Sequence, residues 1–241
     1  MASESLDVVV VGAGHAGLAV SHELAAAGVD HVVLERTDSV ASSWAGRWDS
    51  FTLVLPNHLV RLPGRAYDGP DPHGFLARDD VVTFLQDYAT SFSAPVRTGV
   101  EVASLRPRPD GRFELRTTDG DELVSRAVVV ATGAFQRLRR PAWVSAIPEG
   151  IQVVEAGEYR NPRTLSEGTV LVVGSGQSGC QIAEDLLIAG RRVVLACGKA
   201  PWAPDAPTGG TSPTGCSIRA SWTPAPTNCP IRGCGWPVAA R

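Results

Sequence analysis

The chain has 241 residues, which suits one large α/β domain or two small ones. Its 22 basic and 25 acidic residues leave a formal net charge of −3 with no block of like charge, so the charge pattern does not support a nucleic-acid or membrane-surface role. No apolar run approaches the roughly 18 residues of a membrane span. The N-terminus lacks the pattern of a secretory signal, so we expect a globular cytoplasmic protein.

The first 35 residues predict a strand, a helix and a second strand. Residues 6–11 are an apolar run with four consecutive valines before a glycine, which favours a buried strand. Residues 17–27 have apolar side chains at helical spacing, and Gly28 follows where a helix C-terminus is expected. Residues 31–35 are a second apolar run. This order indicates a βαβ unit with parallel strands.

The rest of the chain continues the α/β pattern. A long excursion from residue 36 to residue 98 contains one predicted helix, at about 79–92. It is followed by predicted strands at residues 100–105, 112–117, 122–125, 127–131 and 169–173. The fold class expected from these elements is α/β, with two Rossmann-like dinucleotide-binding units and an irregular C-terminal tail.

The second unit repeats the first at a constant offset. The segment VVVVGAGHAGLAVSHEL at Val8 corresponds to VLVVGSGQSGCQIAEDL at Val170, 162 positions later. The glycines of the first turn, Gly12, Gly14 and Gly17, thereby correspond to Gly174, Gly176 and Gly179. An internal repeat is stronger evidence than one glycine motif alone, and it predicts two nucleotide sites in one chain.

Each glycine of the first turn has a separate chemical role. Gly12 permits the tight turn, Gly14 lets a pyrophosphate approach the backbone, and Gly17 lets helix and strand pack closely. The helix N-terminus supplies N–H groups and a positive dipole for the phosphates. Glu35 ends the second strand, where its carboxylate can accept hydrogen bonds from both ribose hydroxyls. The alternative is a glycine-rich turn without a ligand.

The second turn differs at the ribose position. The offset of 162 places Cys197 where the first unit has Glu35, so no carboxylate is present there to repel a 2′-phosphate. Basic side chains lie nearby in the sequence, at Arg191, Arg192 and Lys199. This pattern favours NADP over NAD. The alternative for the three basic residues is a solvated strand edge.

Several segments carry a family resemblance. They are GRWDSFTLVLPNHLVRLPG at residues 46–64, DPHGFLARDDVVTFLQDYA at 71–89, EYRNP at 158–162, the two glycine turns and Ala131-Thr132-Gly133. Together they resemble the flavin-containing monooxygenase-like oxidoreductases over about residues 5–202. In that family the first site holds FAD and the second holds NADPH, and a peroxyflavin oxygenates a small organic substrate. The resemblance implies such an enzyme, with molecular oxygen as co-substrate, and does not identify the substrate.

The resemblance also implies the site residues. Those for FAD are Gly12, Gly14, Gly17, Glu35, Trp44, Arg47, Asn57, Val102, Thr132 and Gly133. Those for NADPH are Gly174, Gly176, Gln177, Ser178, Gly179 and Lys199. No catalytic acid or base is assigned, because the cofactor carries the chemistry. No metal site is expected, since the cysteines near the C-terminus lack the paired spacing of zinc ligands.

Two features depart from the family pattern. Glu155 occupies the position of the family histidine four residues before Tyr159, which leaves a subgroup difference and a lost function open. Beyond Trp202 the apolar periodicity stops and the composition is typical of out-of-frame translation. We expect a truncated or frameshifted member, and a natural disordered tail is the alternative.

These observations predict three segments along the chain. They are an FAD-binding domain at 1–165, an incomplete NADP-binding domain at 166–202 and an irregular or disordered tail at 203–241. The function predicted is an FAD-dependent, NADPH-using oxidoreductase of the monooxygenase type. The alternative is a non-catalytic flavoprotein fragment of such an enzyme.

Overall fold

The computed structural model describes residues 4–134 and 139–197, and the chain divides into two compact units. Among these residues, the first unit contains 4–46, 52–134 and 139–146, and the second contains Arg47–Phe51 and 147–197. The chain therefore leaves the first unit after Gly46, contributes five residues to the second unit and returns at Thr52. The predicted tail lies outside the described residues, and the expected domain boundaries at 165 and 202 stay a prediction.

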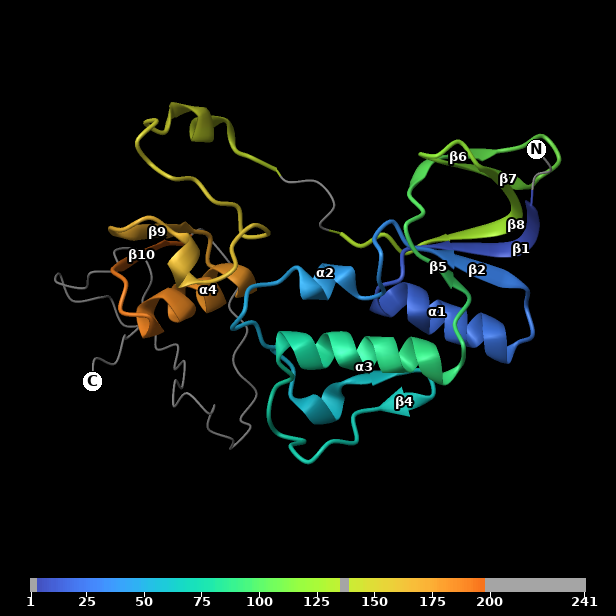
Figure 1. Ribbon diagram of the computed structural model, residues 1–241, viewed down its shortest axis with the longest axis horizontal. Helices are drawn as coiled ribbons and strands as arrows, with labels where there is room; N and C mark the ends of the chain where they lie inside the picture. The colour runs from blue at the N-terminus through green and yellow to red at the C-terminus, as the bar shows by residue number, and fades with distance from the viewer. Residues whose placement is uncertain (1–3, 135–138, 198–241) are drawn as a thin grey trace. The chain divides into compact units, whose positions relative to one another are not determined.

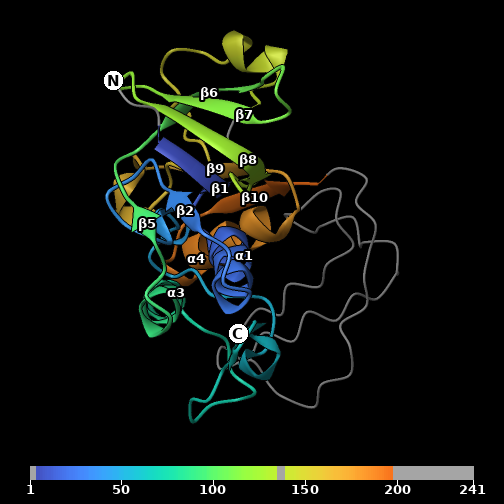
Figure 2. The same ribbon diagram turned by 90° about the vertical axis from the view of Figure 1, so that its right-hand side faces the viewer.

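A six-stranded sheet forms the first unit (Figure 1). Its strand order is β5 (Val96–Arg97), β2 (His31–Leu34), β1 (Glu4–Val11), β8 (Glu122–Val130), β7 (Phe113–Thr117) and β6 (Val102–Pro107). The strands from β5 to β8 pair in parallel, whereas β7 and β6 extend the sheet in antiparallel fashion. Figure 2 shows the strands following one another from β6 down to β5. The expected α/β class with a parallel sheet is confirmed.

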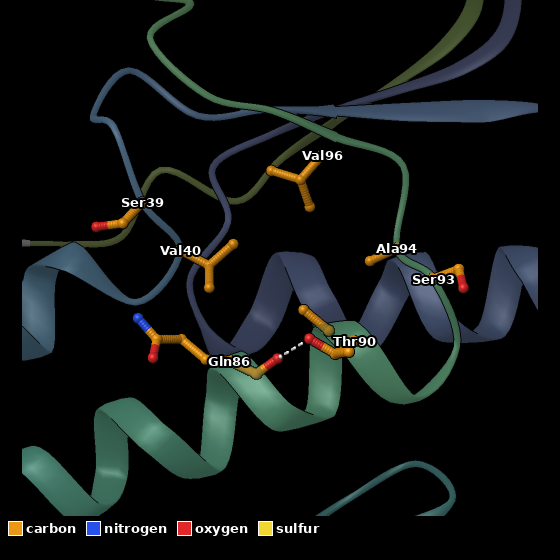
Figure 3. Close-up of a pocket in the computed structure, with 8 residues that line it drawn as sticks. Ser39, Val40, Gln86, Thr90, Ser93, Ala94 and Val96 are labelled. Carbon is orange, nitrogen blue, oxygen red and sulfur yellow. Dashed lines mark hydrogen bonds between the residues drawn. The ribbon is translucent and has the colours of Figure 1, made fainter.

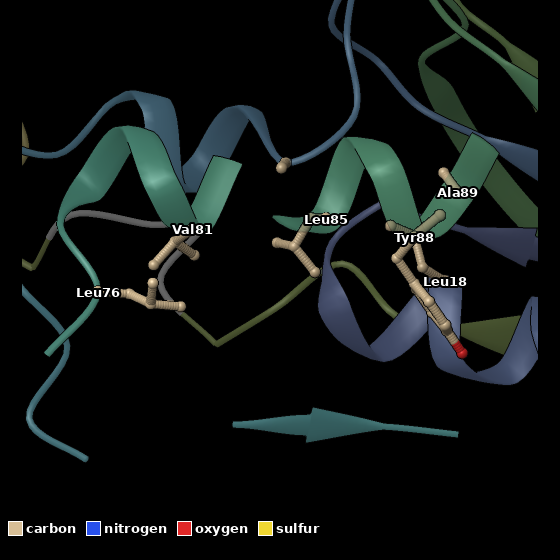
Figure 4. Close-up of a cluster of buried hydrophobic side chains, with 7 residues drawn as sticks. Leu18, Leu76, Val81, Leu85, Tyr88 and Ala89 are labelled. Atoms are coloured by element: carbon tan, nitrogen blue, oxygen red, sulfur yellow. The ribbon is translucent and has the colours of Figure 1, made fainter. Parts of the chain in front are cut away.

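Two long helices lie side by side on one face of the parallel strands (Figures 1 and 2). They are α1 (His15–Ala26) and α3 (Arg78–Ser91), close to the helices predicted at 17–27 and 79–92. Their contact buries Leu18 of α1 against Leu85 and Tyr88 of α3 (Figure 4). The excursion between them also contains α2 (Ser42–Ala45), the 3-10 helix η1 (Asn57–Leu59) and the hairpin β3 (Arg61–Leu62) to β4 (Arg65–Ala66).

Both faces of the central strands are buried. Val8, Val10 and Val33 pack on one face with apolar residues of α1. On the opposite face, Val9 and Val32 pack in a cluster that includes Leu115 of β7 and Leu123 of β8. Side chains alternate between faces along a strand, so a run of valines is what a strand buried on both sides requires.

One strand prediction was wrong. The segments 122–125 and 127–131 were expected as two strands, but β8 is continuous from Glu122 to Val130. Its first residues pair antiparallel with β7 and its length from Leu123 onward pairs parallel with β1. The polar residue at the expected break, Ser125, is buried because its hydroxyl donates to the carbonyls of Asp7 and Ala127, at 3.2 and 2.6 Å.

The second unit contains the repeated βαβ elements. They are β9 (Val170–Val173), α4 (Gln177–Ile188) and β10 (Val193–Ala196), with β9 and β10 paired in parallel. Their bounds equal those of the paired part of β1, of α1 and of β2 shifted by 162 positions, in agreement with the sequence repeat. The register is shifted by the same amount, since Val8 pairs with His31 and Val170 pairs with Val193. Two further 3-10 helices are η2 (Ala142–Ala146), in the first unit, and η3 (Pro162–Thr164), in the second.

Candidate dinucleotide-binding sites

The first glycine turn joins β1 to α1 and needs glycine at two of its positions for packing reasons. Gly12 has φ 107°, in the left-handed region, and a Cβ there would lie 2.6 Å from the carbonyl oxygen of Ala131. A Cβ on Gly17 would lie 1.9 Å from the carbonyl oxygen of Gly12. The turn can therefore form only if helix and strand meet without side chains at these positions.

Gly14 is different, because its conformation and surroundings would accept a side chain. It is the N-cap of α1 with φ −79° and ψ −178°, and no described heavy atom lies within 4 Å of a Cβ built on it. The cap has no side-chain hydrogen bond, and the first turn of α1 carries no acidic residue. The open space and the positive helix end suit a pyrophosphate that approaches the bare backbone.

The Glu35 carboxylate is held at the rim of this turn. It lies directly after β2 and is buried, and its Oε2 accepts a hydrogen bond from the Ala13 backbone N–H at 2.8 Å. Its Oε1 accepts from the Thr37 N–H at 3.1 Å and from the Thr37 hydroxyl at 2.9 Å. Because each carboxylate oxygen can accept two hydrogen bonds, Oε2 keeps capacity for a ribose hydroxyl.

Thr37 and Ala13 are site residues that sequence reasoning missed. Ala13 contributes only its backbone, so no side-chain signal could have revealed it. Thr37 could have been found, because a hydroxyl two residues after a carboxylate can bond to it within one turn.

Two further predicted residues, Thr132 and Gly133, lie beyond the carboxyl end of β8, and a third, Val102, lies in the antiparallel part of the sheet. Thr132 follows β8, and its Cα lies 3.4 Å from a Cβ built on Gly12. Gly133 follows with φ 79°, and both residues are exposed. Val102 begins β6 and packs half-buried against the cluster that contains Val9. Thr132 and Gly133 lie where the parallel strands end, which is where ligands bind in open α/β sheets.

Trp44 and Asn57 also belong to the first unit. Trp44 is in α2, and its ring centroid lies 6.1 Å from that of His15, the first residue of α1. Asn57 is buried, and its Nδ2 donates to the Asp71 carbonyl at 2.8 Å. Its Oδ1 is buried and has no donor among the described residues.

Three features of the first site suit a bound dinucleotide. An open backbone cradle at Gly14, a helix N-terminus without a side-chain cap and a buried acceptor on Asn57 are each features that a bound molecule would satisfy. The residues of the first site therefore fit a group such as FAD.

Arg47 differs from the other residues predicted for FAD in the unit to which it belongs. It belongs to the second unit, and its guanidinium lies 5.8 Å from the centre of the Phe51 ring.

The second glycine turn has the same geometry as the first. Gly174 has φ 109°, and a Cβ on Gly179 would lie 1.9 Å from the Gly174 carbonyl oxygen. Gly176 is the N-cap of α4 with φ −74° and ψ 176°, and no described heavy atom lies within 4 Å of a Cβ built on it. Gln177 and Ser178 are the first residues of α4. This turn also fits a dinucleotide pyrophosphate.

Cys197 directly follows β10, where Glu35 follows β2 in the first unit. The residue expected at the 2′-phosphate, Lys199, lies outside the described residues.

Two of the three basic residues that favoured NADP in the sequence, Arg191 and Arg192, lie away from the end of β10 where a nucleotide is expected. Both precede β10, at the opposite end of the strand from Cys197. The Arg191 guanidinium donates to backbone carbonyls of the connection before β9, those of Pro162, Leu165, Ser166 and Gly168. Nucleotides bind at the carboxyl ends of parallel strands, so a basic residue at the amino end does not support the preference for NADP.

Cys180, which follows Gly179, has the properties of a packing residue. Burial, and secondarily the carboxylate of Glu184, raises the pKa of its thiol. Its Sγ lies 3.5 Å from the Ser175 carbonyl oxygen. A reactive thiol is favoured by a lowered pKa, so these surroundings do not favour a redox role for Cys180.

Glu155 has a backbone role in the loop that carries Tyr159. Its carbonyl oxygen accepts hydrogen bonds from the N–H groups of Glu158 and Tyr159, at 2.8 and 3.1 Å. The residue at the family histidine position thus starts the turn that places Tyr159 in the interior of the second unit.

A pocket of about 380 Å³ opens in the first unit beside α3 and the start of β5 (Figure 3). Its polar side chains belong to Ser39, Gln86, Thr90 and Ser93, and the Thr90 hydroxyl donates to the Gln86 carbonyl at 2.9 Å. None of the residues predicted to bind nucleotide lines it. The pocket is therefore not part of either predicted site.

Two kinds of feature are not found in the part of the chain that the structure describes. Residues 4–134 and 139–197 contain no helix with the length and apolar character that a membrane span needs. Within the same ranges, no three His, Cys, Asp or Glu side chains gather as metal ligands.

The chain is similar to oxidoreductases over most of its length. It is 38% identical over 181 residues to an uncharacterised CzcO-like oxidoreductase of Geobacillus kaustophilus, covering 75% of this chain and 51% of that protein. It is 33% identical over 187 residues to a probable indole-3-pyruvate monooxygenase of Arabidopsis thaliana, covering 74% of this chain and 44% of that protein. The chain thus spans about half the length of these relatives.

Solved structures have the same fold. A flavin-containing monooxygenase from Stenotrophomonas maltophilia matches with a TM-score of 0.75 and 26% identity, covering 83% of this chain and 59% of that one. A steroid monooxygenase bound to NADP matches with a TM-score of 0.61 at 24% identity, covering 79% and 38%, which shows the fold alone. These matches confirm the resemblance to flavin-containing monooxygenases.

The family model of the pyridine nucleotide-disulphide oxidoreductases matches residues 9–213, which include both glycine turns. The match extends over more than half of the chain, from the first strand through the repeated βαβ unit. The chain therefore belongs to the pyridine nucleotide-disulphide oxidoreductase family.

Proposed function

We propose that the chain is an FAD- and NADPH-dependent oxidoreductase of the monooxygenase type, which acts on a small organic substrate. The observation that carries the proposal is the repeated glycine turn, with φ 107° at Gly12 and 109° at Gly174 and open backbone at Gly14 and Gly176. Two phosphate cradles in one chain suit an enzyme that passes electrons from one dinucleotide to another. The similarity to monooxygenases supports the same reaction type.

The first site is assigned to FAD. The N–H groups at the start of α1 hold its pyrophosphate, and Glu35 accepts hydrogen bonds from its ribose. The Ala13 and Thr37 bonds orient the Glu35 carboxylate before the ligand arrives, so little ordering is required on binding.

The second site is assigned to NADPH. The start of α4 holds the pyrophosphate, and the uncharged Cys197 position leaves room for a 2′-phosphate without repulsion. A flavin held by the start of α1 and Glu35 would supply the acceptor for a hydride from NADPH and the reductant for oxygen. The overall reaction consumes NADPH, a proton, O₂ and the substrate, and yields NADP⁺, water and the oxygenated substrate.

One observation favours a non-catalytic flavoprotein fragment as the second candidate. Leu171 and Val173 of β9 are 60% and 57% exposed, whereas Val9, the counterpart of Leu171, is fully buried at 0% exposed. The chain also spans about half the length of its relatives. A nucleotide site with an uncovered sheet can bind its ligand and still lack the surroundings that catalysis needs.

Two matched substitutions test the assignment. Gly14→Ala and Gly176→Ala each add one methyl group to an open cradle without a backbone clash, so both variants should fold. Gly14→Ala should weaken FAD binding roughly tenfold or more by flavin fluorescence titration, since phosphate contacts to the backbone are lost. Gly176→Ala should weaken NADPH binding to a similar extent and leave FAD binding unchanged.

The same preparation separates the two candidates. The enzyme should be yellow, bind NADPH more tightly than NADH in calorimetry, and consume NADPH with amine, sulfide or ketone substrates. Binding of both nucleotides without NADPH consumption would support the fragment. Folded protein that takes up neither nucleotide would contradict both.

A further inference from the structure

The segment Arg47–Phe51 is attached to the second unit by specific bonds. The Asp49 N–H donates to the Arg160 carbonyl at 2.8 Å, and the Asn161 Nδ2 donates to the Asp49 Oδ2 at 2.7 Å. On either side of Asp49, Trp48 and Phe51 are buried, with their rings edge to face and centroids 5.2 Å apart. Backbone, side chain and aromatic contacts therefore hold these five residues in place.

The loop that receives this segment is itself tied to α4. Tyr159 is 3% exposed, and its hydroxyl donates to the Asp185 carboxylate of α4 at 2.5 Å. Burial and this carboxylate raise the pKa of the Tyr159 hydroxyl, which keeps the donor protonated. Asn161 also accepts a hydrogen bond on its Oδ1 from the Arg163 N–H at 3.1 Å. Adjacent residues of one loop thus contact α4 and Asp49.

The chain on both sides of Arg47–Phe51 belongs to the first unit. On the N-terminal side the chain is continuous with Trp44 in α2, and on the C-terminal side it runs through Thr52 to Asn57 in η1. Both Trp44 and Asn57 are residues that the resemblance assigns to the flavin. Two hydrogen bonds and a short stretch of chain therefore connect the helix whose start is assigned to NADPH with the segments assigned to FAD.

We propose that Asn161 and Asp49 are positioning residues, which transmit the placement of α4 to the flavin-lining segments through Arg47–Phe51. The inference rests on the proposed function, and it adds residues that contact neither cofactor site. Its physical basis is that hydride transfer depends steeply on the geometry of the two reactants, so fixing the connecting segment raises the rate without strengthening the binding of either nucleotide.

The bond between Asn161 and Asp49 can be broken and restored without removing the cap of η3. Asn161→Asp keeps an oxygen for the Arg163 N–H but places a carboxylate against Asp49, so the pair repels. Adding Asp49→Asn to Asn161→Asp restores the hydrogen bond with donor and acceptor exchanged, because the amide now lies at position 49 and the carboxylate at position 161. Arg163→Gln is the matched control, because it changes the net charge equally at an exposed side chain of the same loop and keeps the backbone.

The first measurement needs no turnover. Hydrogen–deuterium exchange of the peptide over residues 47–51 should slow when NADP⁺ is added to the unsubstituted chain. Asn161→Asp should abolish this slowing, while the double variant and Arg163→Gln should keep it. Calorimetry on the same samples should give an unchanged affinity for NADP⁺ in all four proteins.

The second measurement is anaerobic flavin reduction by NADPH in the FAD-loaded chain. At saturating NADPH, Asn161→Asp should reduce flavin roughly tenfold more slowly, and the double variant should recover to within roughly threefold. A slower maximal rate with unchanged nucleotide affinities identifies a positioning role, because a variant that fails to fold would also lose nucleotide affinity.

The outcomes separate this inference from the proposed function. If both nucleotides bind and NADPH reduces the flavin, but Asn161→Asp changes neither exchange nor rate, the inference is wrong and the proposed function stands. If the double variant is as impaired as Asn161→Asp, the reversed bond does not rescue and the inference is also wrong. If the unsubstituted chain binds neither nucleotide, or binds both without flavin reduction, the proposed function fails and the inference with it.

Discussion

The carbonyl oxygen of Gly12 lies 1.9 Å from the point where a Cβ on Gly17 would stand, and the same distance separates the Gly174 oxygen from a Cβ on Gly179. Neither contact could be relieved by a side-chain rotation, because the carbonyl oxygen is a backbone atom and the position of a Cβ is fixed by the backbone. The turn and the helix that follows it are therefore packed as one rigid piece in each unit.

Alanine at Gly17 and at Gly14 should have opposite consequences. Gly17→Ala should lower the free energy of unfolding by about 3 kcal/mol or more, because the backbone must shift to admit the methyl group. Gly14→Ala should stay within about 1 kcal/mol of the unsubstituted protein, because its φ is ordinary and no described atom is near. Denaturant unfolding followed by circular dichroism measures both. Equal destabilisation by the two substitutions would contradict this account of the turn.

Glu35→Gln should affect both stability and flavin binding. The amide –NH₂ group would face backbone N–H groups that now donate to the carboxylate, so a buried donor loses its acceptor at a cost of about 1–3 kcal/mol. FAD affinity should fall roughly tenfold, because one ribose acceptor is replaced by a donor.

Thermal unfolding and flavin fluorescence titration test the Glu35→Gln variant. The control is Asp38→Asn, which removes an equal charge from an exposed neighbouring position and should change neither quantity. A Glu35→Gln variant that is less stable but binds FAD normally would remove Glu35 from the cofactor site and leave it a structural residue.

Tyr159→Phe should destabilise the second unit by about 1.5–3 kcal/mol, since a buried hydrogen bond to a carboxylate is lost. The pH dependence has a definite sign. The pKa of the Tyr159 hydroxyl is raised above its ordinary value of 10.0, so the unfolded chain releases the proton first. The contribution is complete below that ordinary pKa and is lost as the pH rises above it.

Thermal unfolding between about pH 8 and pH 11 measures this effect. The unsubstituted protein should lose stability in the alkaline part of this range, and Tyr159→Phe should lose less. Some alkaline loss should remain in the variant, because burial also raises the pKa of Tyr88 in the first unit. A Tyr159→Phe curve parallel to that of the unsubstituted protein would show that folding does not raise the pKa of the Tyr159 hydroxyl.

The elements predicted best are those that depend on local residues. The two βαβ units appear at the expected positions because glycine spacing and valine runs act within a few residues of one another. The break expected inside β8 was wrong because Ser125 is satisfied by the carbonyl of Asp7, a residue 118 positions away. The short edge strand β5 has only two residues, Val96–Arg97, too few to produce a period.

The sequence by itself determined the two phosphate cradles, since a turn that needs positive φ at one glycine and no Cβ at another admits few other residues. It also determined the offset between the units, because the same local rules act twice. Only the tertiary structure decided that Arg191 holds backbone carbonyls instead of a phosphate. It alone placed Arg47–Phe51 in the second unit, because those contacts join residues more than a hundred positions apart, and no local pattern encodes such pairings.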